Sequence, residues 1–168
     1  MHYQLTTYFV NPDWIVAEKA GFMDDISLRP TTYLKRCVLD AENKIRRGRG
    51  LVTSGKLIAE QSFGFWTSLF DAHHYRLIGG CVIHCFPNKP SNINRSTIAT
   101  MLSMIRDFRN RVYHNEPICF QGATINLQTA IAAKQAIYDL IEWVDPQLVS
   151  YFYTYDSIDD KINAVQSI

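Results

Sequence analysis

The segment 105–117, read as IRDFRNRVYHNEP, holds the residues of this chain whose types and spacing best suit chemistry. At about 100° per helical residue, Arg109, Asn110 and His114 lie near one another beside an apolar stripe. Arg106 falls on the same side, whereas Arg111 points to the far side. The spacing therefore predicts that Arg109, Asn110 and His114 converge at the C-terminal end of a helix.

Arginine and histidine together are suited to phosphate chemistry. A guanidinium presents a planar fork of donors to phosphate oxygens, and a neutral imidazole exchanges a proton near pH 7. Metal-independent RNA cleavage needs a base for the ribose 2′-OH, stabilisation of an anionic phosphorus and an acid for the leaving 5′ oxygen. His114 fits the proton transfer and Arg109 the charge stabilisation. A structural alternative stays open, because Arg and His near a helix C-terminus also satisfy its last carbonyls.

Three blocks of the chain resemble a known family, the Abi-like (abortive infection) branch of the HEPN domain superfamily. Arg109 and His114 match its R-x(4 to 6)-H signature. Residues 59–66, AEQSFGFW, are similar to the branch's AE-x-SFGFW helix, and residues 110–118, NRVYHNEPI, to its RNR-x-x-H-x-EPI block. The similarity extends over residues 13–146, which is most of the chain.

The resemblance implies an all-α, HEPN-like helical bundle that pairs through the motif helix as a homodimer. It also implies a composite, metal-independent endoribonuclease site in which Arg109 and His114 are catalytic and Asn110 orients them. The substrate would be RNA, no metal or cofactor would be needed, and the setting would be a bacterial phage-defence or toxin system with an antitoxin or regulatory partner. Longer members have additional N-terminal helices, so this chain is expected to be N-terminally short.

Two further predictions concern phosphate contacts and an alternative function without catalysis. Arg106 and Arg111 are predicted, from charge and position, to contact the phosphates of a bound nucleic acid. Some HEPN members do not cleave RNA. The alternative function is therefore a non-catalytic module that binds RNA, nucleotide or a protein partner through the same cleft.

Composition predicts one globular domain over residues 1–168. Of these residues 47% are hydrophobic and 20% charged, which excludes a disordered chain, and the length excludes two large domains. The 17 basic and 16 acidic side chains give a net charge of +1, so any nucleic acid must be bound by a local patch. Charge is uneven, because residues 35–49 are mainly basic and residues 139–160 mainly acidic.

The chain contains no run of about 20 apolar residues and does not start like a signal peptide. We therefore expect a cytoplasmic protein without a membrane span. In that compartment Cys37, Cys81, Cys85 and Cys119 would stay reduced.

Hydrophobic spacing and end signals predict a bundle of helices with few strand signals. The β-formers cluster only at Val52 and at residues 151–155, and the latter more often pack in a helical bundle than stack on bases. A helix through residues 54–70 would be apolar on every side and therefore buried. The expected helical segments are 31–47, 54–70, 75–86, 95–113, 127–144 and 147–153.

Several other residues invite a functional hypothesis and also have a plainer explanation. Glu60, in the apolar 54–70 segment, is expected to pair with Arg109 or Arg106, or else to reach the surface. The spacing of Cys81, His84 and Cys85 fits no zinc motif, so buried thiols are the default and no metal site is predicted. His73–His74 fits a polar helix end. The basic segment 44–50 could attract RNA, although solvation of a helix end is the commoner explanation.

Overall fold

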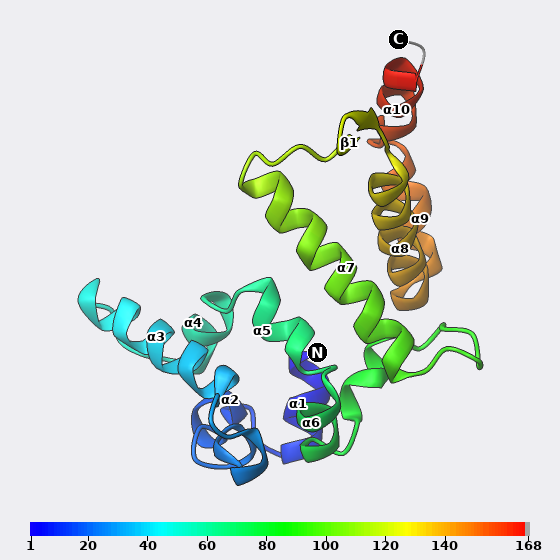
Figure 1. Cartoon of the computed structure of the whole chain (residues 1–168). Coiled ribbons are helices and arrows are strands. Elements are labelled where there is room, and N and C mark those ends of the chain that lie inside the picture. The colour runs from blue at the N-terminus through cyan, green and yellow to red at the C-terminus, as the bar shows by residue number, and fades with distance from the viewer. Residues whose placement is uncertain (167–168) are drawn as a thin grey trace. The chain divides into compact units, whose positions relative to one another are not determined.

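The structure, a computed structural model, describes residues 1–166 and divides into two compact units, Met1–Cys85 and the part that begins at Phe86. Both units are helical, and the one sheet among the described residues is a two-stranded hairpin (Figure 1). The predicted all-α class is confirmed. Within residues 1–166, no helix combines the length and the apolar character needed to span a bilayer.

The first unit is built from short helices around one longer helix, α3. Its core contains side chains that are completely buried, among them Trp14, Phe65 and Phe70. The Trp14 indole donates a hydrogen bond to His2 Nδ1 at 2.9 Å, which ties α2 to α1. The elements are α1 (His2–Phe9), α2 (Trp14–Ala17), η1 (Phe22–Asp24), η2 (Ile26–Leu28), α3 (Tyr33–Arg47), α4 (Ser54–Ala59), α5 (Phe63–Ser68), α6 (Ala72–Leu77) and η3 (Cys81–Cys85).

Helix α3 confirms the helix predicted over residues 31–47. Its buried residues Leu34, Val38, Ala41 and Ile45 recur every three or four positions, so one face packs in the core. The opposite face is polar, and the last turn is basic, as the helix dipole favours. Sequence periodicity is sufficient to find such a helix, because its signal is local.

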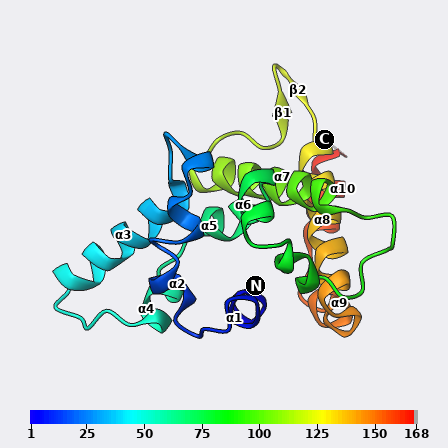
Figure 2. The ribbon, with the colours of Figure 1, turned by 90° about the horizontal axis from the view of Figure 1, so that it is seen from below.

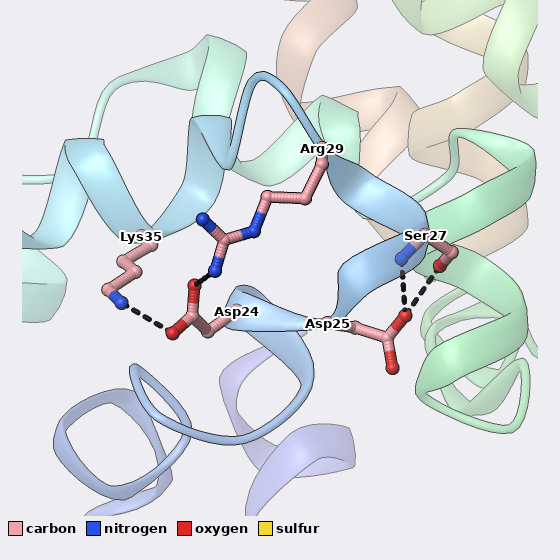
Figure 3. Close-up of polar contacts among 5 residues, drawn as sticks. All are labelled: Asp24, Asp25, Ser27, Arg29 and Lys35. Atoms are coloured by element: carbon pink, nitrogen blue, oxygen red, sulfur yellow. Dashed lines mark hydrogen bonds and ion pairs between the residues drawn. The ribbon is translucent and has the colours of Figure 1, made fainter.

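Carboxylates fix the two 3₁₀ turns that precede α3 (Figure 3). Asp24 accepts hydrogen bonds from Lys35 at 2.7 Å and Arg29 at 3.0 Å, and the bond from Lys35 is the main cause that lowers the pKa of Asp24. Asp25 caps η2 by accepting from the Ser27 hydroxyl and backbone N–H, which lowers the pKa of Asp25. The bond between Asp24 and Lys35 connects η1 to the start of α3.

The single helix predicted over residues 54–70 is wrong, because the chain breaks after α4 and starts again at α5. Ser62 is the N-cap of α5, and its hydroxyl accepts from Phe65 N–H at 3.3 Å. Gln61 meanwhile donates from its side chain to the Leu57 carbonyl at 2.9 Å. The break changes the direction of the chain. The apolar residues that would cover every side of one long helix therefore enter the core from two short helices, α4 and α5.

The apolar stretch 75–86 is divided in the same way. Gly79 and Gly80 have φ of 56° and 71°, a left-handed conformation that ends α6 and leads into η3. A Cβ at Gly79 would lie 2.7 Å from the Tyr8 ring, so the chain also needs glycine there for close packing against α1.

The second unit consists of three packed helices, a hairpin and a C-terminal helix. Helix α7 packs against α8, and α8 against α9, as Figure 1 shows. The expected helices over 95–113, 127–144 and 147–153 are confirmed to within one residue. The bounds are α7 (Arg95–Tyr113), β1 (Phe120–Gln121), β2 (Thr124–Ile125), α8 (Gln128–Val144), α9 (Pro146–Tyr153) and α10 (Ile158–Gln166).

The hairpin and α10 were not predicted. Strands β1 and β2 pair antiparallel, with Phe120 opposite Ile125, around Gly122 at φ 62° (Figure 2). Two-residue strands lack the alternating pattern by which a strand is found in a sequence. The hairpin lies between α7 and α8 in the chain, directly after the candidate motif.

Candidate active site

Helix α7 positions the predicted motif at its C-terminal end. Asn94 caps its start, with Oδ1 accepting from Thr97 N–H at 3.1 Å. Its end has the hydrogen bonds of a Schellman motif: Glu116 N–H donates to the Arg111 carbonyl at 2.9 Å and Asn115 N–H to the Val112 carbonyl at 3.1 Å. Asn115 has φ 54°, a left-handed conformation that asparagine tolerates. His114 is therefore held at the C-cap.

The last turn of α7 is exposed on its apolar side as well as its polar side. Ile98 and Leu102 are buried near the start, as the apolar stripe predicts. The apolar residues spaced three and four apart along this helix, which end at Val112, were expected to form one buried stripe. Val112 is 47% exposed, and Tyr113 is 73% exposed. The prediction is wrong at Val112 because the helix extends beyond the core of its unit. Two large apolar side chains are thus exposed within the motif.

Arg109 and His114 both lie next to the Tyr113 ring. The Arg109 guanidinium carbon lies 5.9 Å from the Tyr113 ring centroid, within cation–π range. The Tyr113 and His114 ring centroids are 5.5 Å apart and nearly perpendicular, at 86°. Arg109, Tyr113 and His114 therefore form a row. Asn110 is connected to His114 only through the helix backbone, where its carbonyl accepts from His114 N–H at 2.9 Å.

The polar side chains of these residues are available to bind a ligand. Arg109, Asn110 and His114 are exposed, and in the part of the chain that the structure describes their side chains form no hydrogen bond or ion pair. Arg109 was expected at the border of a buried face, with a partner from within the fold, across an interface or from a substrate. It lies at the surface instead, where its charge remains hydrated. An exposed guanidinium without a carboxylate partner can donate hydrogen bonds to a phosphate.

Arg111 and Arg106 differ from Arg109 in having neighbours of their own. Arg111 donates to the Pro117 carbonyl, and its Nε lies 3.6 Å from Glu116 Oε2, so it braces the turn after α7. Arg106 Nε lies 3.4 Å from the exposed carboxylate of Asp107. The predicted role of both arginines in nucleic-acid binding stays a prediction.

Tyr113 is the member of this row that sequence analysis missed. Its position four residues after Arg109 is the signal that would have found it, because residues at i and i+4 meet on a helix. An aromatic ring beside an apolar stripe is easily assigned to the core instead.

Glu60 has a different partner from the arginine expected. It is the C-cap of α4, and its carboxylate lies 2.5 Å from Lys44 Nζ. The pair closes α3 against α4 within the first unit. The continuous apolar helix on which the arginine hypothesis depended is absent.

The three cysteines of the first unit, Cys37, Cys81 and Cys85, occupy partly buried positions. Burial, with a smaller contribution from Cys85, raises the pKa of Cys81 to about 11. Within residues 1–166, no three His, Cys, Asp or Glu side chains gather as metal ligands. His73 is exposed as expected, but His74 is buried, with Nδ1 at 2.9 Å from the Ser68 carbonyl.

Comparisons with protein-family models, with curated proteins and with solved structures return no match for this chain.

Proposed function

We propose that this chain is a metal-independent endoribonuclease of the HEPN type, acting as a homodimer in a bacterial phage-defence or toxin system. The observation that supports it is that Arg109 and His114, both exposed and without a carboxylate partner, each lie next to the Tyr113 ring. The phage-defence setting, and the antitoxin or regulatory partner that goes with it, come from the sequence resemblance.

The proposed reaction needs only the groups of this row. His114 of one copy takes the proton from the ribose 2′-OH, and the 2′ oxygen attacks the adjacent phosphorus. Arg109 stabilises the negative charge that develops on the phosphate oxygens. The bond from phosphorus to the 5′ oxygen breaks, and protonated His114 of the second copy gives that oxygen a proton. The products are a 2′,3′-cyclic phosphate and a free 5′-hydroxyl.

Pairing through α7 is supported by the exposed apolar surface around the motif. Val112 and Tyr113 are large side chains that a second copy of α7 would bury. Val112→Glu is expected to shift a dimer toward monomer in analytical ultracentrifugation, whereas Val16→Glu, at a similarly exposed site in α2, should not. Dimerisation that survives Val112→Glu unchanged would contradict pairing at this surface.

The decisive experiment is cleavage of end-labelled transfer RNA and of an unstructured RNA in excess EDTA. Wild-type protein is expected to produce fragments with cyclic-phosphate ends, and Arg109→Ala and His114→Ala should lose at least about a hundredfold in rate. His73→Ala removes an exposed histidine elsewhere and is the matched control. Circular dichroism establishes that each variant is folded.

Two outcomes would overturn the proposal. Cleavage that persists in folded His114→Ala would show that another group, or a contaminant, is responsible. No cleavage by a folded wild-type dimer, together with RNA binding, would favour the non-catalytic HEPN module.

A further inference from the structure

The end of α3 and the loop that leads to α4 present a cluster of positive charge. Residues 43–59 contain five basic and no acidic residues. One of the five, Lys44, pairs with Glu60. The other four are exposed, and we call them the basic cluster: Arg46, Arg47, Arg49 and Lys56.

Several other cations of the first unit have carboxylate partners, whereas the side chains of the basic cluster have none among the described residues. Lys19 pairs with Glu42, and Lys35 with Asp24. Among the described residues, no side chain of the basic cluster forms a hydrogen bond or an ion pair. Mutual repulsion of such charges is unfavourable unless an anion binds among them.

The backbone places an arginine in this cluster at a position that favours glycine. Gly50 N–H donates to the Ile45 carbonyl and Arg49 N–H to the Arg46 carbonyl, both at 2.9 Å, as in a Schellman motif. Arg49 occupies the left-handed residue, at φ 57°, with glycines on both sides. A residue with a side chain is less stable than glycine in this conformation. Stability therefore does not explain why the position holds an arginine.

Lys56, at the start of α4, lies against the same loop. Its Nζ is 3.6 Å from the point where a Cβ would stand at Gly50. Because Gly50 has no side chain, the ammonium group is close to the backbone of the loop that holds Arg49. Two consecutive elements therefore contribute to one cationic surface.

We infer that the basic cluster binds the phosphate backbone of single-stranded RNA, as a contact surface in addition to Arg109 and His114. Three of its four members are arginines, whose planar forks match phosphate oxygens. A lipid surface fits less well: the apolar face of α3 is buried in the core, and Leu51, at 76% exposure, is the large apolar side chain that the loop exposes. The choice of RNA among polyanions rests on the proposed function.

Binding is tested separately from cleavage by using a fluorescent 20-nucleotide 2′-O-methyl RNA, which lacks the attacking hydroxyl. Anisotropy titrations from 50 to 300 mM NaCl compare wild type with the variant R46Q/R47Q/R49Q. We expect at least tenfold weaker binding near 0.1 M salt. The slope of log K against log salt should fall by about 2, because each phosphate contact on a single strand contributes about 0.7. The matched control R36Q/R76Q/K161Q removes the same charge from other exposed positions, and its RNA affinity should fall much less.

Arg49→Gly separates binding from stability. It removes a cation and relieves the left-handed backbone, so the melting temperature should rise while RNA affinity falls several-fold. If Arg49 had only a structural role, affinity would not fall in this variant.

The inference is overturned if wild type does not bind the RNA, if R46Q/R47Q/R49Q binds it as wild type does, or if the control variant loses as much affinity. It is also overturned, in favour of a lipid surface, if the basic cluster is needed for binding to vesicles with 30% phosphatidylserine but not to RNA. Failure of the proposed function has a different signature. The basic cluster would then still bind the 2′-O-methyl RNA, while unmodified RNA stays uncut.

Discussion

The Lys134 ammonium on α8 lies 2.8 Å from the Asp156 carboxylate, in the turn that precedes α10. The Asp156 and Lys134 side chains are only 8% and 13% exposed. Tyr138 donates to the same carboxylate oxygen at 2.7 Å, and Ile158 N–H donates to the other at 2.8 Å. This pair fixes the start of α10 to α8.

The Lys134–Asp156 pair predicts how the second unit responds to pH. The bond from Lys134, followed by those from Ile158 and Tyr138, lowers the pKa of Asp156 to about 2. The stability that Asp156 contributes is therefore complete above about pH 4 and lost as the pH falls toward 2. Hydrogen exchange in α8 and α10 should accelerate over that interval. Asp156→Asn should flatten this acid response, whereas the exposed control Asp160→Asn should leave it unchanged.

At alkaline pH the same cluster should lose stability as the pH rises. Burial, with the bond to Asp156, raises the pKa of Tyr138 to about 12, and hydrogen bonds to Asp156 and Asp159 raise the pKa of Lys134. Stability from these protonated groups is complete below about pH 10 and lost as the pH rises above it. Phenolate absorbance should include a step near pH 12 that belongs to Tyr138. A Tyr138→Phe variant that retains this step would contradict the assignment.

The two carboxylates that contact Lys134 should differ in their contribution to stability. Asp159 is 72% exposed, so Asp159→Ala should cost less than about 1 kcal/mol. Asp156→Ala removes the buried partner and should cost about 2 to 3 kcal/mol. Urea denaturation of both variants at pH 7 measures the difference. Equal costs would show that burial does not strengthen the Lys134–Asp156 pair.

Val10 predicts a stabilising substitution. This β-branched residue ends α1 at φ 51° and is 89% exposed, so it has backbone strain without compensating burial. Val10→Gly should raise the free energy of unfolding by about 1 kcal/mol. Tyr3→Gly, at an exposed position inside the same helix, should lower it by about the same amount. A loss of stability in Val10→Gly would refute the left-handed assignment.

Tyr113 predicts an effect on the proposed reaction without itself transferring a proton. Its ring orients Arg109 and His114, so Tyr113→Ala should lower the cleavage rate about fivefold, the equivalent of about 1 kcal/mol. Tyr113→Phe retains the ring and should cleave at nearly the wild-type rate. If phenylalanine fails to rescue activity, the hydroxyl rather than the ring is responsible.

Local signals in the sequence were enough to locate the long helices. Helix α3 has an apolar residue every three or four positions and glycine after its end, and α7 has an N-cap at Asn94 and a stop at Asn115. Such features depend on neighbours within one or two helical turns, so they can be recognised in the sequence before the fold is known. The same periodicity located Arg109, Asn110 and His114 at the C-terminal end of α7.

Tertiary structure decided the features that depend on distant residues. The break at Glu60–Ser62 follows from packing two apolar segments into one core, which a uniformly apolar run does not reveal. Val112 is exposed because α7 extends beyond the core, and no local pattern encodes where a core ends. Asp156 and Lys134 meet only after α9 returns the chain to α8, so their burial and altered pKa values are properties of the folded unit.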